Sequence, residues 1–499
     1  MTGSLFAARR AGVLLHLTSL PSPYGSGDMS HAAYRFVEFL AAAGVGVWQV
    51  LPLGPTHADL SPYDSTSAHA GNPRLISLDW LRDRGLLDAA ALEAVRSGAR
   101  DRQWALDAAA AGFAAAYARD AALAAEFAGW CRDSAWLEDY ALFTAIREVR
   151  GGLPWYAWEA PLREREPGAL AGVAARLAPR IAALRFEQFV FARQWAALRD
   201  FAAARGVRLF GDMPIFVAHD STDVWSARGM FLLDAAGQPL TVAGVPPDYF
   251  SADGQRWGNP HYDWDAMARD GFAWWRRRLA TQRERFDLVR IDHFRGFEAC
   301  WHIPREAASA VHGRWEPGPG EALLAALLEQ SGAGTLVAEN LGVITPAVEQ
   351  LRERFGLPGM LILQFAFDSD ARNGYLPHNH APLNVVYTGT HDNDTSLGWF
   401  TSLDKGTRER VMAYLGMPAE PMPWPLLRAA LASVARLAVL PLQDLLGLGS
   451  KHRMNLPGVA QGNWRWQFRE RDLTPELAGR LRALVELYGR IPAPEQFHR

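Results

Sequence analysis

Four carboxylates stand where short apolar runs of the chain end, each inside a motif of polar and turn residues. They are Asp212 in Gly-Asp-Met-Pro, Asp292 in Arg-Ile-Asp-His-Phe-Arg-Gly, Glu339 in Ala-Glu-Asn-Leu-Gly and Asp392 in His-Asp-Asn-Asp. Burying a carboxylate is unfavourable unless it gains partners, so four of them in such places indicate a function. Two carboxyl groups whose pKa values are pushed apart can cleave a glycosidic bond. We therefore predict glycoside chemistry here.

The neighbours of Asp292 and Glu339 predict different protonation states for the two. Arg290 and Asp292 are two residues apart on a predicted strand and share a face, whereas Val289 and Ile291 face the covering helices. A guanidinium beside Asp292 favours the ionised form that a nucleophile requires. Glu339 follows the apolar run Thr335-Leu-Val-Ala, which favours the protonated form of a general acid.

Two other interpretations of these acids remain open. Each could be a helix N-cap or part of a loop salt bridge, since capping is a common use of Asp. A metal site is the second alternative, because His378, His380, His391 and Asp394 could supply ligands. No His-x-x-x-His or other ligand spacing supports such a site, so we predict neither a metal nor a cofactor.

The elements that must position the acids are eight apolar or β-branched runs separated by helical stretches, a pattern that predicts a (β/α)₈ TIM barrel. The runs are Gly12–Leu17, Val45–Leu51, Val207–Asp212, Leu288–Asp292, Thr335–Glu339, Met360–Phe365, Asn384–Thr390 and Leu437–Leu442. The carboxyl ends of barrel strands converge on one mouth, so the four acids are expected to meet there.

The spacing of the runs also predicts insertions. About 150 residues separate the second run from the third, far more than one crossover helix needs. We predict a first barrel segment at 1–54, a mainly helical inserted subdomain at 55–205, with helices over Leu106–Trp130 and Gly168–Leu198, and the rest of the barrel at 206–499. The stretch at about 221–262 is rich in Gly, Pro and aromatic residues, which is typical of an active-site loop.

Composition narrows the function classes. The 51 Lys and Arg against 54 Asp and Glu give a net charge of −3, which argues against nucleic acid or an acidic membrane as a partner. Only two cysteines, Cys131 and Cys300, are present, so we predict a reducing, cytoplasmic location. Arg9-Arg10 before Val13-Leu-Leu imitates a signal peptide, but the apolar run stops at His16, and no uncharged run approaches the ~18 residues of a membrane span.

At these same residues the chain resembles the 4-α-glucanotransferases, also called amylomaltases or disproportionating enzymes, of glycoside hydrolase family 77. The resembling motifs extend over nearly the whole chain and include Leu20-Pro-Ser-Pro-Tyr-Gly, Ser61-Pro-Tyr-Asp-Ser-Thr-Ser-Ala-His-Ala-Gly-Asn-Pro, Gly211-Asp-Met-Pro-Ile-Phe-Val, Gly244-Val-Pro-Pro-Asp-Tyr-Phe, Arg256-Trp-Gly-Asn-Pro, Arg290-Ile-Asp-His-Phe-Arg-Gly, Tyr375-Leu-Pro-His-Asn, Gly389-Thr-His-Asp-Asn-Asp-Thr, Arg453-Met-Asn-Leu-Pro-Gly and Asn463-Trp.

The resemblance implies a role for each residue of the predicted site. Asp292 would be the nucleophile, Glu339 the general acid and base, and Asp392 the carboxylate that holds ring hydroxyls in the transition state. The substrate-binding residues it implies are Tyr63, Asp212, Trp257, Arg290, His391 and Asn463. Tyr63 could instead be a loop anchor, Trp257 a core residue, His391 a satisfied strand-end histidine and Asn463 an Asx-turn residue.

Four positions depart from the usual family pattern. Asn340 stands in place of Asp, Asp64 in place of Gln, His69 in place of Phe and Gln467 in place of Arg. The loss of a charge next to Glu339 bears on the strength of that acid. The other three changes bear on sugar contacts and leave the preferred glucan length open.

The resemblance implies retaining transfer of α-1,4-glucan segments between maltooligosaccharide, starch or glycogen-type substrates through a covalent intermediate. The same three acids also fit an α-amylase-like hydrolase, because hydrolysis shares that intermediate. A non-catalytic glucan-binding barrel is a further alternative, which would predict loss of at least one of the three. The oligomeric state stays open.

Overall fold

The computed structural model describes residues 5–247, 253–332, 334–459 and 461–491 of the 499-residue chain. Parts of two predicted features lie outside these residues. They are Asp248-Tyr-Phe of the Gly244 motif and the centre of the predicted loop between Pro246 and Trp257.

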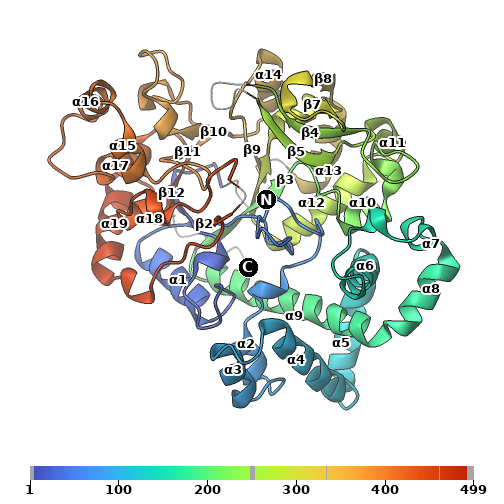
Figure 1. Cartoon of the computed structure of the whole chain (residues 1–499). Coiled ribbons are helices and arrows are strands. Elements are labelled where there is room, and N and C mark those ends of the chain that lie inside the picture. The colour runs from blue at the N-terminus through green and yellow to red at the C-terminus, as the bar shows by residue number, and fades with distance from the viewer. Residues whose placement is uncertain (1–4, 248–252, 333, 460, 492–499) are drawn as a thin grey trace.

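Eight parallel strands form a nearly closed barrel, which confirms the predicted TIM-barrel class (Figure 1). Their order around the sheet is β10-β11-β12-β1-β2-β3-β6-β9. The strands are β1 (Arg10–Leu14), β2 (Val47–Gln49), β3 (Arg208–Pro214), β6 (Leu288–Asp292), β9 (Leu336–Ala338), β10 (Gly359–Ile362), β11 (Asn384–Tyr387) and β12 (Leu437–Pro441). Each overlaps one of the eight runs predicted from the sequence.

The seam between β9 and β10 is closed by a few specific bonds. The backbone N–H of Ala338 donates to the carbonyl of Pro358 over 2.8 Å. The side-chain oxygen of Asn340 accepts from the N–H of Met360 over 2.8 Å, and its amide nitrogen donates to Glu349 over 2.6 Å. Asn340 therefore acts as a brace between two strands.

Side chains alternate between the inside and the outside of the barrel along each strand. On β6, Val289 and Ile291 pack into the large cluster that the barrel shares with its helices. Leu288 points inward and joins the cluster that fills the barrel. Arg290 and Asp292 lie on this inner side, so the predicted division of the β6 side chains between two faces is confirmed. The inner cluster includes Leu14, Val47, Phe210, Leu288, Val337, Met360, Ile362, Val385, Tyr387, Leu437 and Val439.

The segment between β2 and β3 is mainly helical, and Figure 1 shows most of its helices on one side of the barrel. The helices are α2 (Leu78–Asp83), α3 (Ala89–Arg96), α4 (Arg102–Tyr117), α5 (Ala121–Asp133), α6 (Leu137–Val149), α7 (Ala160–Arg163), α8 (Pro167–Arg176) and α9 (Ala178–Ala203). The stretch Leu106–Trp130, predicted to be helical, is divided between α4 and α5, and the carboxylate of Asp120 caps the N–H groups of Ala122 and Leu123 at the start of α5.

The remaining helices surround the strands or follow them. They are α1 (His31–Ala42), α10 (Thr222–Ser226), α11 (Trp264–Arg269), α12 (Ala273–Arg285), α13 (Gly320–Ser331), α14 (Pro346–Arg354), α15 (Ser396–Ser402), α16 (Lys405–Tyr414), α17 (Trp424–Ala432), α18 (Leu442–Leu445) and α19 (Pro475–Leu487).

A second sheet, which the sequence analysis did not predict, has four antiparallel strands in the order β5-β4-β7-β8. The strands are β4 (Thr241–Val245), β5 (Gln255–Pro260), β7 (Ala299–Pro304) and β8 (Arg314–Pro317). The stretch 221–262, which we expected to be an irregular loop, thus contains α10 and two strands. The Gly and Pro residues of this stretch obscured its strand pattern. In addition, the pairing of β4 with β5 is irregular, because its register shifts between Val242 and Gly244.

Candidate active site

The four predicted carboxylates come from four barrel elements at the mouth. Asp212 lies in β3, directly opposite Arg290 of β6 in the register of the two strands, and Asp292 is the last residue of β6. Glu339 follows β9 directly, and Asp392 lies five positions after the end of β11. The helices that begin near them have other residues at the N-cap position, namely Ser221, Thr345 and Thr395. The hydroxyls of Ser221 and Thr395 accept an N–H of the first turn.

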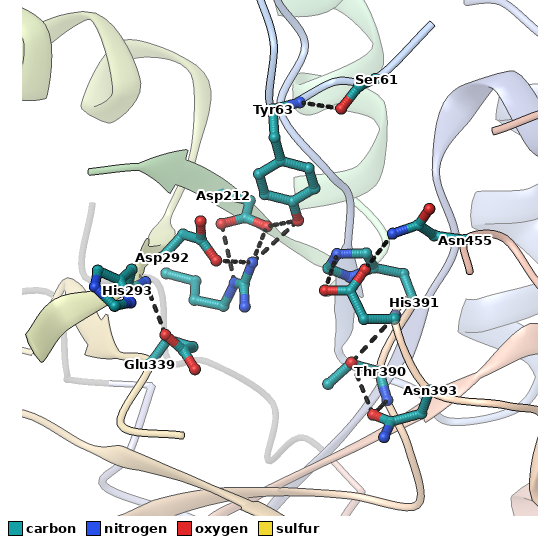
Figure 2. Close-up of polar contacts among 12 residues, drawn as sticks. Ser61, Tyr63, Asp212, Asp292, His293, Glu339, Thr390, His391, Asn393 and Asn455 are labelled. Carbon is teal, nitrogen blue, oxygen red and sulfur yellow. Dashed lines mark hydrogen bonds and ion pairs between the residues drawn. The ribbon is translucent and has the colours of Figure 1, made fainter. Parts of the chain in front are cut away.

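Arg290 joins two of these acids beneath the mouth. Its Nε donates to Asp212 over 2.9 Å, and one terminal nitrogen donates to Asp212 over 2.7 Å and to Asp292 over 2.9 Å. The hydroxyl of Tyr63 donates to the same Asp212 carboxylate over 2.6 Å (Figure 2). Asp212 and Arg290 are buried, whereas the Asp292 side chain is 30% exposed. Asp212 therefore fits the alternative in which an acid serves as a salt-bridge partner. Asp292 is the acid whose side chain is partly exposed to the open site.

Asp292 has a higher pKa than the sequence analysis expected. Desolvation raises the pKa of Asp292 to about 6, and the charges of Asp212 and Asp392 act in the same direction. Arg290 lowers the pKa, as predicted, but it does not offset the other effects completely. Asp292 is still mainly ionised at neutral pH.

Glu339 is held by backbone amides. The N–H of His293 donates to one carboxyl oxygen over 2.7 Å and the N–H of Leu341 to the other over 3.1 Å. Desolvation and the charge of Asp292 raise the pKa of Glu339 to about 8, although Arg290 and the two amides oppose them. The carboxyl is therefore protonated at neutral pH, as the apolar approach predicted.

His293 is a functional residue that the sequence analysis missed. Its φ of 52° is left-handed, a conformation that non-glycine residues adopt only where the surroundings hold them. This turn is what points its N–H at Glu339. The ring packs edge-to-face on Trp257, with 5.0 Å between ring centroids. The only signal in the sequence was its place directly after Asp292.

Asp392 lies beside His391 and Asn455, which Figure 2 shows on the opposite side of the site from Glu339. Its side chain is 49% exposed, and it accepts a 2.6 Å hydrogen bond from the amide of Asn455. The Nε2 of His391 lies 3.3 Å from the other carboxylate oxygen. Desolvation acts to raise the pKa of Asp392, but His391 and the bond from Asn455 outweigh it and hold the pKa below its usual range.

His391 connects this acid to the Arg290 network. Its ring stacks on Tyr63, with 5.2 Å between centroids and 13° between planes. Tyr63, in turn, bonds Asp212. The structure thus brings Tyr63, Asp212, Arg290 and His391 together with the three predicted catalytic acids.

Two further residues position Asp392 and were not predicted. Asn455 belongs to the motif Arg453-Met-Asn-Leu-Pro-Gly, which did not by itself indicate a role for this residue. Buried Asp444, the third residue of α18, accepts hydrogen bonds from the hydroxyl of Thr388 over 2.6 Å and from the N–H and hydroxyl of Ser396 over 2.7 and 2.6 Å. It therefore fixes both ends of the segment that carries His391 and Asp392.

Trp257 and Asn463 do not contact the carboxylates. Trp257 is 40% exposed on β5 and reaches the site only through His293. The side chain of Asn463 closes its own loop: it accepts from the N–H of Leu456 over 3.0 Å and donates to the carbonyl of Val459 over 2.8 Å. These bonds run to residues seven and four positions earlier in the chain, so they close a loop and differ from the Asx turn that was the alternative for Asn463.

The departures from the family pattern make contacts away from the three acids. Asn340 braces the barrel seam, so its side chain is directed away from the catalytic carboxyls. His69 bonds the hydroxyl of Thr281 over 2.8 Å, and Gln467 donates to the carbonyl of Leu20 over 2.9 Å. Asp64 lies in the hairpin beside Tyr63, where desolvation raises its pKa.

Neither a metal cluster nor a membrane helix is found in the part of the chain that the structure describes. No group of three or more His, Cys, Asp or Glu side chains there is arranged to hold a metal ion. None of the helices in the same residues combines the length and the apolar character that a membrane crossing requires.

Comparison with known proteins identifies the family of this chain. The sequence profile of the 4-alpha-glucanotransferases matches residues 15–474. A 4-alpha-glucanotransferase of Thermus thermophilus is 50% identical, with 97% of this chain and 99% of the relative covered. A chloroplastic/amyloplastic 4-alpha-glucanotransferase of Solanum tuberosum is 44% identical, with 97% and 87% covered.

A solved structure gives the same result. The amylomaltase of Streptococcus agalactiae, in complex with acarbose, superimposes with a TM-score of 0.93 at 36% identity, covering 97% of this chain and 100% of that one. The resemblance drawn from the motifs is therefore confirmed. This chain belongs to the 4-alpha-glucanotransferase family, glycoside hydrolase family 77.

Proposed function

We propose that the chain transfers α-1,4-glucan segments from a donor glucan to the 4-hydroxyl of an acceptor, by a retaining double displacement at Asp292. The observation that carries the proposal is the opposite protonation of two carboxyls at one barrel mouth. Asp292, with a pKa of about 6, is ionised at neutral pH, and Glu339, with a pKa of about 8, is protonated. A nucleophile and a general acid require these states.

In the first step, an Asp292 oxygen attacks the anomeric carbon while Glu339 gives its proton to the glycosidic oxygen. The bond between that oxygen and the anomeric carbon breaks, and the shortened glucan leaves with a new hydroxyl. Asp292 is then joined to the donor segment by an ester bond, and Glu339 is ionised. Arg290, bonded to both Asp212 and Asp292, orients the nucleophile.

In the second step, ionised Glu339 removes the proton from the 4-hydroxyl of an acceptor. The acceptor oxygen attacks the anomeric carbon, and the ester to Asp292 breaks. Both carboxyls return to their starting states, and the configuration at the anomeric carbon is retained. The backbone amides of His293 and Leu341 stabilise Glu339 during the interval when it is charged.

The other residues bind and orient the sugar at the point of cleavage. Asp392, ionised and held by Asn455, accepts hydrogen bonds from ring hydroxyls as positive charge develops on the ring. His391 assists beside it, and Tyr63 supplies an aromatic face for the sugar. The resemblance also implies a sugar-binding role for Asp212, but its carboxylate is buried against Arg290 and Tyr63, so it acts by positioning these two residues.

Trp257 and Asn463 act further from the reacting carbon. The exposed indole of Trp257 offers a stacking surface on the acceptor side, next to the His293 turn. Asn463 shapes the loop that carries Asn455, and it contributes a sugar contact only if its loop bonds exchange on binding.

Transfer rather than hydrolysis is the expected outcome because the relatives that match 97% of this chain are transferases by name. The acarbose bound to the streptococcal amylomaltase supports an α-glucan as the ligand class. A cytoplasmic location is proposed for a different reason. Cys131 and Cys300 are both free cysteines of the described chain, which fits a reducing compartment.

The test is incubation of the purified protein with maltotriose, without added metal or nucleotide. Product lengths are followed by mass spectrometry, and total reducing ends by a colorimetric assay. Glucose and a ladder of longer maltodextrins at constant reducing ends support transfer. Rising reducing ends would identify a hydrolase, and unchanged maltotriose, equal to an Asp292→Asn control, would favour a binding protein.

A further inference from the structure

A small cavity lies beside Tyr63 and Asp212 but extends away from the sugar site. It is bounded by the carboxyl ends of β2 and β3, by the loop that carries Tyr63, and by α12. Its volume of about 40 Å³ has room for one monatomic ion with a water molecule. The hydrogen-bonding side chains that face it away from the Asp212 end are Ser65, Ser67, Arg278, Gln282 and Arg285.

Arg278 is a buried cation without a carboxylate partner. Its side chain is almost fully buried, with a residue exposure of 2%. Its terminal nitrogens donate to the carbonyls of Pro214 and Ile215 and to the hydroxyl of Tyr262. Its Nε is buried and has no hydrogen-bond partner among the described residues. A buried guanidinium is strongly unfavourable unless opposite charge approaches it.

Arg285, two turns further along α12, is only partly buried but also lacks a carboxylate partner among the described residues. Its one hydrogen bond within the described chain goes to the carbonyl of His69, and its guanidinium lies 5.5 Å from the ring centre of Phe191. Burial lowers its pKa to about 10, because only the neighbouring exposed Glu284 offers compensating charge. Neither arginine forms a salt bridge with any described carboxylate.

The charges around the cavity leave a positive excess. Asp212 borders the cavity, but its carboxylate is already bound by Arg290 through two hydrogen bonds. Asp223 is the nearby acid that interacts with Arg278, and its carboxylate also accepts the N–H of Ala68 over 2.7 Å. Of the arginines on α12, Arg278 and Arg285 line the cavity. One ionised Asp223 balances one of these two, which leaves one positive charge.

His69 lies close to the same arginines. It is buried, and its ring nitrogen bonds the hydroxyl of Thr281 on α12. Burial lowers its pKa to about 3, and Arg278, Arg285 and Arg277 all act in the same direction. The neutral ring adds no charge of its own, so the surplus belongs to the arginines.

We propose that this cavity binds one small monovalent anion, such as chloride, between Arg278 and Arg285. The amide of Gln282 and the hydroxyl of Ser67 supply further donors at its wall. Ser65 and Ser67 belong to the loop that carries Tyr63, and Pro214 ends the strand that carries Asp212. The bound anion therefore fastens α12 to the loop and strand that position both residues, and this inference does not depend on the proposed reaction.

The direct test is crystallography with bromide, which has the same charge as chloride and scatters anomalously. Crystals grown without halide are soaked in sodium bromide, and an anomalous difference map is calculated. The proposal predicts a peak inside the cavity, between the two guanidinium groups. A map with bromide at the protein surface but none in this cavity would overturn it.

The second test measures Tm and the maltotriose disproportionation rate in gluconate buffer while chloride replaces gluconate at constant ionic strength. We expect Tm to rise saturably, by an amount on the order of 2 °C, and the rate to rise with it. The Arg285→Gln variant should lose the saturable rise. Arg277→Gln, which removes an exposed arginine from the same helix, should keep it.

A Gln282→Glu variant is the control for the case in which Arg285→Gln loses the chloride response only because it folds poorly. The new carboxylate supplies an internal negative charge at the cavity wall and should stabilise the protein without chloride. We expect its Tm in gluconate to reach that of the wild type in chloride, with no further rise on adding chloride. A wild-type Tm independent of chloride, or an equal chloride response in all three variants, would contradict an anion site.

Discussion

The bond between Asn455 and Asp392 allows a quantitative test of how the third carboxylate is positioned. The amide of Asn455 donates to one Asp392 oxygen over 2.6 Å, while His391 lies beside the other. In an Asn455→Ala variant, Asp392 keeps its backbone position, because Arg453 still donates to its carbonyl over 2.8 Å. The carboxylate loses one of its two side-chain partners and gains rotational freedom.

The size of the effect follows from the geometry. A hydrogen bond to a charged group contributes roughly 1.5–3 kcal/mol, and the half-exposed Asp392 places this bond at the lower end of that range. About 1.5 kcal/mol of lost transition-state stabilisation corresponds to roughly a tenfold fall in kcat/KM. The variant should also raise the pKa of Asp392, because the lost bond favoured its ionised form.

The assay is the initial rate of maltotriose disproportionation in a double-mutant cycle. Asn455→Ala is measured in the wild type and in an Asp392→Asn background, where the charged acceptor is already gone. The tenfold loss should appear in the first and shrink to less than about threefold in the second. An Asn384→Ala variant, which alters an amide at the opposite end of β11, should retain wild-type activity.

Equal losses from Asn455→Ala in both backgrounds would refute the reasoning. They would show that Asn455 acts on the loop as a whole rather than on the carboxylate of Asp392. A loss below twofold in the wild type would show that His391 alone suffices to position the acid.

Three further predictions follow from the same structure. The pH dependence of kcat/KM should be bell-shaped, falling below about pH 6 as Asp292 is protonated and above about pH 8 as Glu339 ionises. A profile that still rises at pH 9 would contradict the acid role of Glu339. The Asp444→Asn variant should lose about 1.5–3 kcal/mol of stability in urea denaturation, and its kcat should fall at nearly constant KM, because the substitution loosens the segment that carries Asp392. An unchanged kcat would show that Asp444 does not position Asp392. Buried Arg490 donates to five backbone carbonyls, those of Leu431, Ser433, Ala435, Arg10 and Arg436. Arg490→Met should therefore lower the free energy of unfolding by about 3 kcal/mol or more, whereas the control Arg482→Met, at an exposed position of α19, should change it little.

The barrel could be predicted because its strands are local apolar runs whose signal does not depend on distant pairing. Val207–Asp212 and Leu288–Asp292 are such runs, and the structure places strands at both. The strand-end acids were visible for the same reason. Alternation along β6 then sufficed to put Arg290 beside Asp292.

The second sheet was not predicted because its strands are short and contain Gly or Pro, and because its two local pairs, β4 with β5 and β7 with β8, are joined only by the long-range pairing of β4 with β7. Gly244 of β4, for example, lies opposite Arg256 on one side and Trp301 on the other. Only the folded chain brings these segments together, so neither segment alone carries a clear strand pattern.

Much of the site's electrostatics was also inaccessible from the sequence. The expectation that Arg290 would lower the pKa of Asp292 identified one real contribution, but the burial of the site and the approach of Asp212 and Asp392 depend on the fold. The left-handed turn at His293 and the contacts of Asn455 and Asp444 likewise arise from segments that meet only in three dimensions. Residue type alone gave no reason to select them.

The central claim, that Asp292 forms a covalent intermediate, is tested most directly by trapping it. A Glu339→Gln variant is mixed with α-maltosyl fluoride, whose fluoride leaves without acid assistance, while the missing base slows the second step. Mass spectrometry of the intact protein and of its proteolytic peptides should find one maltosyl group attached to Asp292. An unmodified protein that still consumes the fluoride, or a maltosyl group on any other residue, would contradict the account.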